Sequence, residues 1–170
     1  MKLNWISFGA LLSLSTLSAR AQAHDMKAGV PSHQVVVTVN GKASTLTMAD
    51  LQAMPQRSIK VHNGHSNEDE TYTGVGMSDL LAKFGLTLDG AGAQKVYHTY
   101  VKAEGTDKYW VLYSASELEP ALSTFDSLLA LTVDGKPIVA EGEFKIVEDG
   151  QRKPARWVRN LSALTIVTLP

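Results

Sequence analysis

Residues 128–167 read "LLALTVDGKPIVAEGEFKIVEDGQRKPARWVRNLSALTIV", and this stretch decides the class of fold. The apolar run at its start predicts a buried strand, and the Asp-Gly pair after it predicts a tight turn. "EGEFKIVEDG" predicts another strand, "RKPARWVRN" a basic turn or short helix, and the final residues a closing strand. Short strands separated by turns indicate a mainly β domain.

The rest of the chain follows the same pattern. Thr47 and Asp50 are spaced as a helix-capping pair, Ser78 is a candidate cap for a second helix, and Gly85 is a candidate stop for it. Residues 72–77 before that second helix read as a loop. Further strands are predicted at 34–41, 43–48, 57–63, 95–103 and 108–114, and short helices at 47–55, 78–85 and 114–122. The sequence therefore predicts a single α+β domain that is mainly β, with short helices.

Residues 1–23 are predicted to be a secretory signal peptide. Lys2 gives a basic start, "WISFGALLSLSTLS" is an apolar run, and "AQA" is a small-residue cleavage motif that ends at Ala23. We therefore expect cleavage after Ala23, a mature domain of residues 24–170 and a periplasmic location. An uncleaved anchor is the alternative, although the run falls short of the ~20 apolar residues that a membrane span needs. No later stretch is apolar enough to insert into a membrane.

Composition excludes several classes of function. The chain has 16 Lys and Arg against 17 Asp and Glu, a balance that argues against general nucleic-acid binding, which needs a basic face. It contains no cysteine. A cysteine nucleophile, a thiolate metal site and a redox dithiol are therefore excluded for this sequence.

The segment "VHNGHSNEDE" at 61–70 places His62 and His65 three residues apart, ahead of three carboxylates. A histidine pair with carboxylates can bind a transition metal, and the amine and imidazole of His24 after cleavage could bind copper. The alternatives are a polar loop that holds another ligand, or a solvated acidic loop. The residues of this segment alone leave these alternatives open.

Two further groups are candidates for binding. "RKPARWVR" places Arg152, Lys153 and Arg156 beside Trp157, and arginine forks suit phosphate oxygens while an aromatic face suits a flat heterocycle. The alternative is a solvated turn beside one core tryptophan. In "EGTDKYW", Asp107 next to Tyr109 could accept paired hydrogen bonds from an amino-pyrimidine edge, or it could be an ordinary turn residue.

Four stretches together resemble a known family. In order along the chain they are "TYTGVGMSDLLAKFGL", "YVKAEGTDKYWVLYSASELEP", "LLALTVDGKPI" and "FKIVEDGQRKPARWVRNLSALTIV". They resemble the molybdopterin-binding domain of the sulfite oxidase superfamily, over nearly all of the mature chain. The resemblance implies that family's α+β, mainly β fold. In the family's enzymes a cysteine on the loop corresponding to residues 60–70 ligates molybdenum, and this chain has none.

The resemblance also implies a site. It places the 62–66 segment on the former metal loop and the 107–109 hairpin facing it, with the basic cluster meeting a phosphate, a polar tail or the ring oxygen. The expected ligand is a dihydro- or tetrahydropterin, with molybdenum unlikely because no thiolate is present. No catalytic or metal-binding residue is expected. The implied binding residues are His62, Asn63, His65, Ser66, Asp107, Tyr109, Arg152, Lys153, Arg156 and Trp157.

Short, exported, cysteine-free members of this fold are similar to the PruR-type pterin-binding proteins. That similarity implies a periplasmic, non-catalytic sensory module, whose partner is the periplasmic domain of an inner-membrane diguanylate cyclase/phosphodiesterase that controls cyclic di-GMP and biofilm formation. Two alternatives stay open. One is a molybdenum-cofactor-dependent oxidoreductase with a non-cysteine ligand, and the other is a histidine-based metal carrier.

Overall fold

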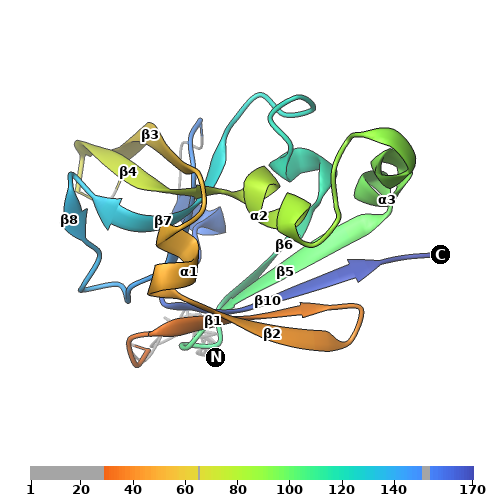
Figure 1. Ribbon diagram of the computed structural model, residues 1–170. Helices are drawn as coiled ribbons and strands as arrows, with labels where there is room; N and C mark the ends of the chain where they lie inside the picture. The colour runs from red at the N-terminus through yellow and green to blue at the C-terminus, as the bar shows by residue number, and fades with distance from the viewer. Residues whose placement is uncertain (1–28, 65, 151–153) are drawn as a thin grey trace, which may run out of the picture.

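The computed structural model describes residues 29–64, 66–150 and 154–170 (Figure 1). The predicted signal peptide and the candidate residues His24, His65, Arg152 and Lys153 lie outside the described residues. Within the described ranges, no helix is both long enough and apolar enough to cross a membrane.

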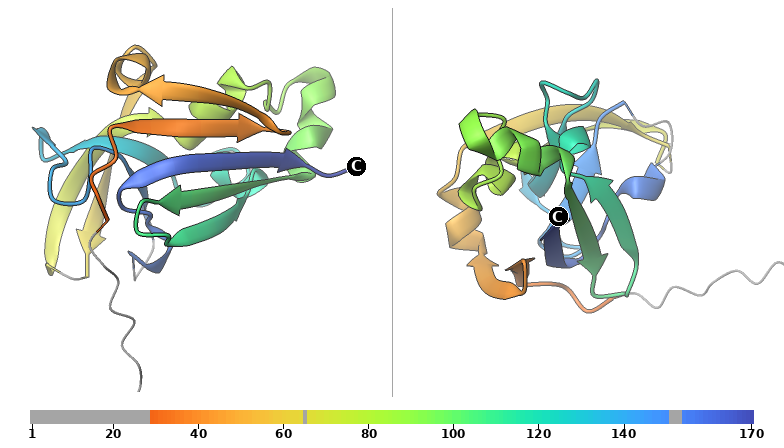
Figure 2. Two further views of the ribbon diagram at one scale, coloured as in Figure 1. Left: turned by 90° about the horizontal axis from the view of Figure 1, so that it is seen from below. Right: turned by 90° about the vertical axis from the view of Figure 1, so that its right-hand side faces the viewer.

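The first of two β-sheets contains both the first and the last strand of the domain. Its strands run in the order β2-β1-β10-β5-β6, and β1 pairs in parallel with β10 while the other neighbours are antiparallel (Figure 2). Its strands are β1 (Gln34–Val39), β2 (Lys42–Thr47), β5 (Thr99–Gly105), β6 (Trp110–Ser114) and β10 (Leu161–Thr168).

The second sheet runs in the order β3-β4-β7-β8, and β9 also pairs with β7. The expectation of a loop at 72–77 is wrong, because residues 72–76 form the second half of β4 and pair with both β3 and β7. Its strands are β3 (Gln56–Asn63), β4 (Glu68–Gly76), β7 (Ser127–Val133), β8 (Lys136–Pro137) and β9 (Lys145–Glu148).

The glycines of this strand give its sequence the composition of a loop. A Cβ atom on Gly74 would lie 2.1 Å from the carbonyl oxygen of Leu129 and 2.7 Å from the Cα of Ala130. The pairing of β4 with β7 also shifts register between Thr73 and Gly74. The strand therefore uses glycine for close backbone approach at a bulge, although glycine is rare within strands in general.

The helices are short, and α1 and α2 directly follow strands. Thr47 caps α1 in a reciprocal capping box with Asp50, as predicted. Gly85 follows α2 with φ +79, which confirms it as the stop. The predicted cap at Ser78 is wrong, because α2 already begins at Met77. The helices are α1 (Met48–Gln52), α2 (Met77–Lys83) and α3 (Ala93–Tyr97), with 3₁₀ turns η1 (Gly90–Gly92), η2 (Ser116–Leu118) and η3 (Pro154–Arg156).

Two other expectations have definite outcomes. Residues 95–97, predicted as the start of a strand, belong to α3, where the buried Val96 packs into the core. The Asn-Gly turn at 40–41 and the Asp-Gly turn at 134–135 are confirmed, since all four residues have positive φ. Such paired positive φ values are typical of the two-residue hairpin turns that these dipeptides favour.

Alternate residues of β7 point into two hydrophobic clusters. Leu129 and Leu131 belong to the main core, which the two sheets and the short helices enclose. Leu128 and Ala130 belong to a smaller cluster on the opposite face of the second sheet. That smaller cluster also contains Ile59, Val61, Tyr72, Ile138, Val147 and Trp157.

Candidate functional site

The end of the β3–β4 hairpin carries the predicted ligand loop. His62 pairs with Asp69 across the hairpin, with Nδ1 and Oδ1 3.0 Å apart, and the Lys60 ammonium lies 3.0 Å from the other Asp69 oxygen. These contacts, led by the His62 hydrogen bond, lower the pKa of Asp69 from its ordinary value. All three side chains are more than half exposed, so they line the surface of the loop.

Beneath this surface, Glu70 is the acceptor to which the polar side chains of the loop donate. Its carboxylate accepts hydrogen bonds from the Asn63 amide at 2.9 and 3.0 Å and from the Ser66 hydroxyl at 3.3 Å. The Tyr72 hydroxyl donates to the same carboxylate at 2.6 Å. Burial, together with this bond to Glu70, raises the pKa of Tyr72, so the phenol keeps its proton and acts as a donor. Glu70 thus fixes both ends of the loop.

A buried ammonium group lies below Tyr72. Lys145 is 2% exposed, and its Nζ donates to the Tyr72 hydroxyl at 3.0 Å and forms an ion pair with Glu141. The same nitrogen lies 4.9 Å from the ring centre of Tyr72 and 4.7 Å from that of Trp157. Two aromatic faces and a carboxylate compensate for the loss of hydration of this charge.

Trp157 belongs to this interior rather than to the surface. Its side chain is 6% exposed, its ring meets Tyr72 edge to face at 5.8 Å, and its indole N–H donates to the carbonyl oxygen of Glu148 at 3.2 Å. Little of the indole face is open to a ligand. Its contacts explain instead how the basic turn is held against the second sheet.

Arg156 joins a second buried network. Its Nε lies 3.3 Å from Glu148, which is fully buried, and its Nη2 lies 2.8 Å from Glu117. Its guanidinium stacks 4.6 Å from the ring centre of Tyr113, whose hydroxyl donates to the Arg156 carbonyl oxygen. Burial raises the pKa of Glu148, and Arg156 opposes that shift. About a third of the Arg156 side chain remains exposed to solvent.

The β5–β6 turn does not face the β3–β4 hairpin end. The right-hand view of Figure 2 shows the two at opposite ends of one side of the molecule. Asp107 accepts from the backbone N–H of Tyr109 at 3.0 Å, as turn aspartates commonly do, and the Tyr109 hydroxyl donates to the carbonyl oxygen of Ala155. The turn is therefore fixed to η3 and not to the loop.

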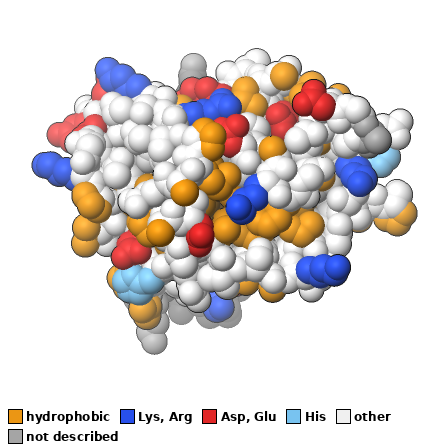
Figure 3. All heavy atoms as spheres, viewed as in Figure 1, with side chains coloured by type: hydrophobic (Ala, Val, Ile, Leu, Met, Phe, Trp, Pro, Cys, Tyr) orange, Lys and Arg blue, Asp and Glu red, His pale blue; other side chains and the backbone are white. Residues whose placement is uncertain are grey.

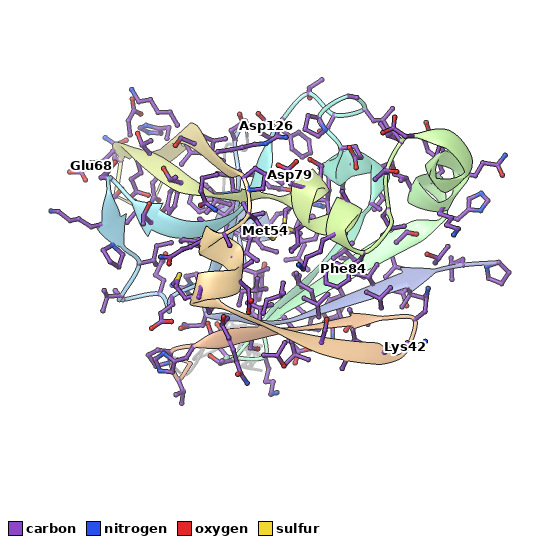
Figure 4. The ribbon with its side chains drawn as sticks, in the orientation of Figure 1. Lys42, Met54, Glu68, Asp79, Phe84 and Asp126 are labelled. Carbon is purple, nitrogen blue, oxygen red and sulfur yellow. The ribbon has the colours of Figure 1, made fainter. Side chains whose placement is uncertain are left out.

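The structure thus groups the predicted residues in two sets. His62, Asn63 and Ser66 lie together on the hairpin that Figure 4 marks with Glu68. Arg156 ends η3, Trp157 follows it, and Tyr109 is hydrogen-bonded to it. The residues that connect the sets are Tyr72 and Lys145, which the sequence analysis missed, although a lysine within the apolar "FKIV" segment was a signal of a paired buried charge.

A shallow apolar depression lies elsewhere, between the β1–β2 hairpin and α2, where Figure 3 shows hydrophobic side chains gathered in a hollow. Figure 4 labels Phe84 and Lys42 at this part of the molecule. Its volume is about 450 Å³, and its lining contains no carboxylate or imidazole. It is lined by Val39, Asn40, Lys42, Ala43, Ser44 and Phe84.

The donor atoms at the hairpin end are nitrogen and oxygen. Among the described residues, no three His, Asp or Glu side chains are grouped so that they could hold a metal ion. The sequence also provides no thiolate, the soft ligand expected for molybdenum in this type of domain. The residues present therefore do not match a thiolate-ligated molybdenum centre.

Comparison with known proteins supports this description of the fold. The crystal structure of the sulfane dehydrogenase SoxCD from Paracoccus pantotrophus is similar with a TM-score of 0.61 and 18% sequence identity. The match covers 79% of this chain and 38% of the SoxCD chain, so this chain spans well under half of that protein. A search of curated protein sequences finds no match.

Residues 21–142 match the family model of the oxidoreductase molybdopterin binding domain. The match covers more than half of the chain, and the mainly β domain with short helices agrees with the fold of the sulfite oxidase superfamily. This confirms both the resemblance and the predicted class of fold. The chain belongs to the oxidoreductase molybdopterin binding domain family.

Proposed function

We infer that this protein is a non-catalytic pterin-binding module that works in the periplasm. The observation that carries the proposal is a molybdopterin-binding fold whose ligand loop offers His62, Asn63 and Ser66 in a chain with no cysteine. A pterin without a metal needs hydrogen-bond partners and a shaped surface, whereas a molybdenum centre of this family needs a thiolate. The loop offers hydrogen-bonding side chains, and the chain lacks the thiolate.

The loop chemistry suits a reduced pterin. The 2-amino group and N3–H of a pterin are donors, and the half-exposed carboxylate of Asp69 at this end of the molecule can accept from them. His62 is exposed beside it and can meet the ring or its substituent. Two or three charge-assisted hydrogen bonds of about 1.5–3 kcal/mol each, with stacking, are enough for micromolar affinity.

The proposed partner is the periplasmic domain of an inner-membrane diguanylate cyclase/phosphodiesterase. Through it, pterin occupancy would control cyclic di-GMP and biofilm formation. Support for this step comes from the resemblance to the PruR-type proteins, since the contacts described above lie within the domain and identify no partner surface. A co-purification of the exported protein with that membrane enzyme, made stronger by added pterin, is the result that would support it.

Removal of the Asn63 amide is expected to weaken pterin binding. Asn63→Ala removes a donor that links the loop to Glu70, and we expect at least a ~10-fold rise in Kd for tetrahydropterin, about 1.4 kcal/mol. Isothermal titration calorimetry on the folded variant measures this change. Lys83→Ala is the matched control, because it removes an exposed cation from α2, outside the β3–β4 hairpin. Equal losses in both variants would mean that Asn63 has no specific role.

Analysis of the purified, exported protein separates the proposal from its main alternative. Denatured extract that contains a pterin but no molybdenum supports the binding module. Stoichiometric molybdenum with a pyranopterin would overturn it in favour of an oxidoreductase with a non-cysteine ligand. Protein that carries neither compound and ignores added pterins would show that the ligand loop has lost this role.

A further inference from the structure

The β6 strand is a free edge of the first sheet, with β5 as its only neighbour in the described structure. It is the outer strand of that sheet in the right-hand view of Figure 2. An exposed edge presents unpaired backbone donors and acceptors, and proteins usually protect it with charged side chains or proline. The other free edges of the two sheets follow that rule, since β2 carries Lys42, β3 carries Arg57 and Lys60, and β8 carries Lys136 and Pro137.

The β6 strand lacks this protection. Its sequence is WVLYS, without a charged residue or a proline. Trp110 is 52% exposed and Leu112 is 47% exposed, and both point to the face opposite the buried Tyr113. On the adjacent strand, Tyr100 is also exposed on that outer face, in register with Ser114. The edge therefore combines free backbone groups with apolar side chains.

The pairing register shows which backbone groups are free. The Gly105 N–H donates to the Tyr109 carbonyl at 2.9 Å, and the Ala115 N–H donates to the Thr99 carbonyl at 2.8 Å. In an antiparallel pair only alternate residues bond to the neighbour, so the odd-numbered residues of β6 face β5. The N–H and C=O groups of Trp110 and Leu112 thus point outward. The Ser114 N–H also points outward, but it already donates to Glu117 at 2.8 Å.

We propose that β6 pairs with β6 of a second copy, so that two antiparallel edges form one continuous sheet across a two-fold axis. The free groups fit this partner. With the axis at Val111, Trp110 lies opposite Leu112 of the second copy, and each residue offers one donor and one acceptor to the other. The next outward-pointing N–H after Leu112 is that of Ser114. Because it already donates to Glu117, the pairing between the two copies stops there.

The side chains fit the same register. Each Trp110 indole lies across from a Leu112 of the second copy, an aromatic–aliphatic pair of the kind that stabilises neighbouring strands. No like charges oppose one another, because neither strand has a charge. A second copy therefore supplies the apolar, uncharged, extended segment that this edge fits. The short strand implies a weak dimer, since small interfaces give concentration-dependent association.

Sedimentation of the full exported protein across a wide concentration range tests the proposal. We expect wild-type protein to dimerise reversibly. Leu112→Lys adds the charge that other edges carry, and should weaken dimerisation at least ~10-fold. Val139→Lys is the matched control, because it replaces another exposed aliphatic residue (77% exposed) outside the strands and should leave dimerisation unchanged. Wild-type protein that stays monomeric at the highest concentrations, or equal effects of both variants, would overturn the proposal.

Hydrogen exchange provides a second test that needs no substitution. The amide protons of Trp110 and Leu112 point to solvent in the monomer and into the new sheet in the dimer. Their exchange should slow at least ~10-fold between dilute and concentrated protein, while that of Val111 should change less, because it already bonds to β5. Concentration-dependent protection elsewhere without any at these two amides would place the interface on another surface.

Discussion

Gly74→Ala is expected to destabilise the protein by about 3 kcal/mol. The new Cβ would lie 2.1 Å from the Leu129 carbonyl oxygen and 2.7 Å from the Ala130 Cα. Both atoms belong to the backbone of β7, so no side chain can rotate away and the strands must separate at a buried site. Urea unfolding of the variant and the wild type measures the difference in free energy of unfolding.

Gly135→Ala is the matched control for this substitution. Gly135 has φ +74, and nothing lies within 4 Å of its Cβ position. Its cost is therefore conformational only, about 1 kcal/mol. If the two variants lose the same stability, the close approach of β4 and β7 is not what requires glycine. The result also bears on the "TGVG" segment of the family resemblance, whose Gly74 has a structural role between strands and no contact with the ligand loop.

Arg156→Ala is expected to cost about 3 kcal/mol at pH 8. The substitution leaves Glu148, which is fully buried, without its cation, and removes the guanidinium that donates to Glu117. It also removes the guanidinium that stacks on Tyr113. The loss is smaller than for a fully buried pair because a third of the Arg156 side chain is exposed.

The loss should shrink as the pH falls. Burial already raises the pKa of Glu148 in the folded protein, and removal of Arg156 raises it further. Below the pKa of the unfolded state both states hold the proton, so the buried charge costs nothing. As the pH rises above that value, the unfolded state releases the proton first and stability falls. The difference between variant and wild type should therefore be smaller at pH 5 than at pH 8.

Two companion variants test the cause. Arg159→Ala removes an exposed guanidinium, 3.8 Å from Glu141, and should change stability by no more than about 0.5 kcal/mol at either pH. Adding Glu148→Gln to Arg156→Ala removes the buried charge and should recover part of the loss at pH 8. A loss that is independent of pH, or a double variant that recovers nothing, would contradict the role given to Glu148.

Local signals predicted the strands and turns well. The Asn-Gly and Asp-Gly dipeptides specified their turns because the positive φ values they favour are local properties. The error at 72–76 has a tertiary cause, since two glycines in five residues resemble a loop until the approach of β7 is known. Residues 95–97 were also not predictable from local sequence, because a single apolar turn of helix and the start of a strand have similar composition.

The site was predictable in part. The polarity of 62–66 indicated where the strand gives way to a loop, because "HNGHS" interrupts an alternating strand, and the ligand role of this loop stays a proposal. The positions of Asp107 and Trp157 were not predictable, since they depend on where the β5–β6 turn and η3 pack. Arg156 illustrates why charge alone is a poor guide, because the distant Glu117 and the buried Glu148 both bind this residue in the folded protein.

The parallel pairing of β1 with β10 has a consequence for the order of folding. More than 120 residues separate Val36 from its partner Ala163, and β10 also pairs with β5. The β1–β2 and β5–β6 hairpins can each form early from local contacts, but nothing joins them into a sheet until β10 is in place. Long-range pairing of this kind slows folding. The chain therefore completes this sheet last, and β10 acts as the closing segment of the domain.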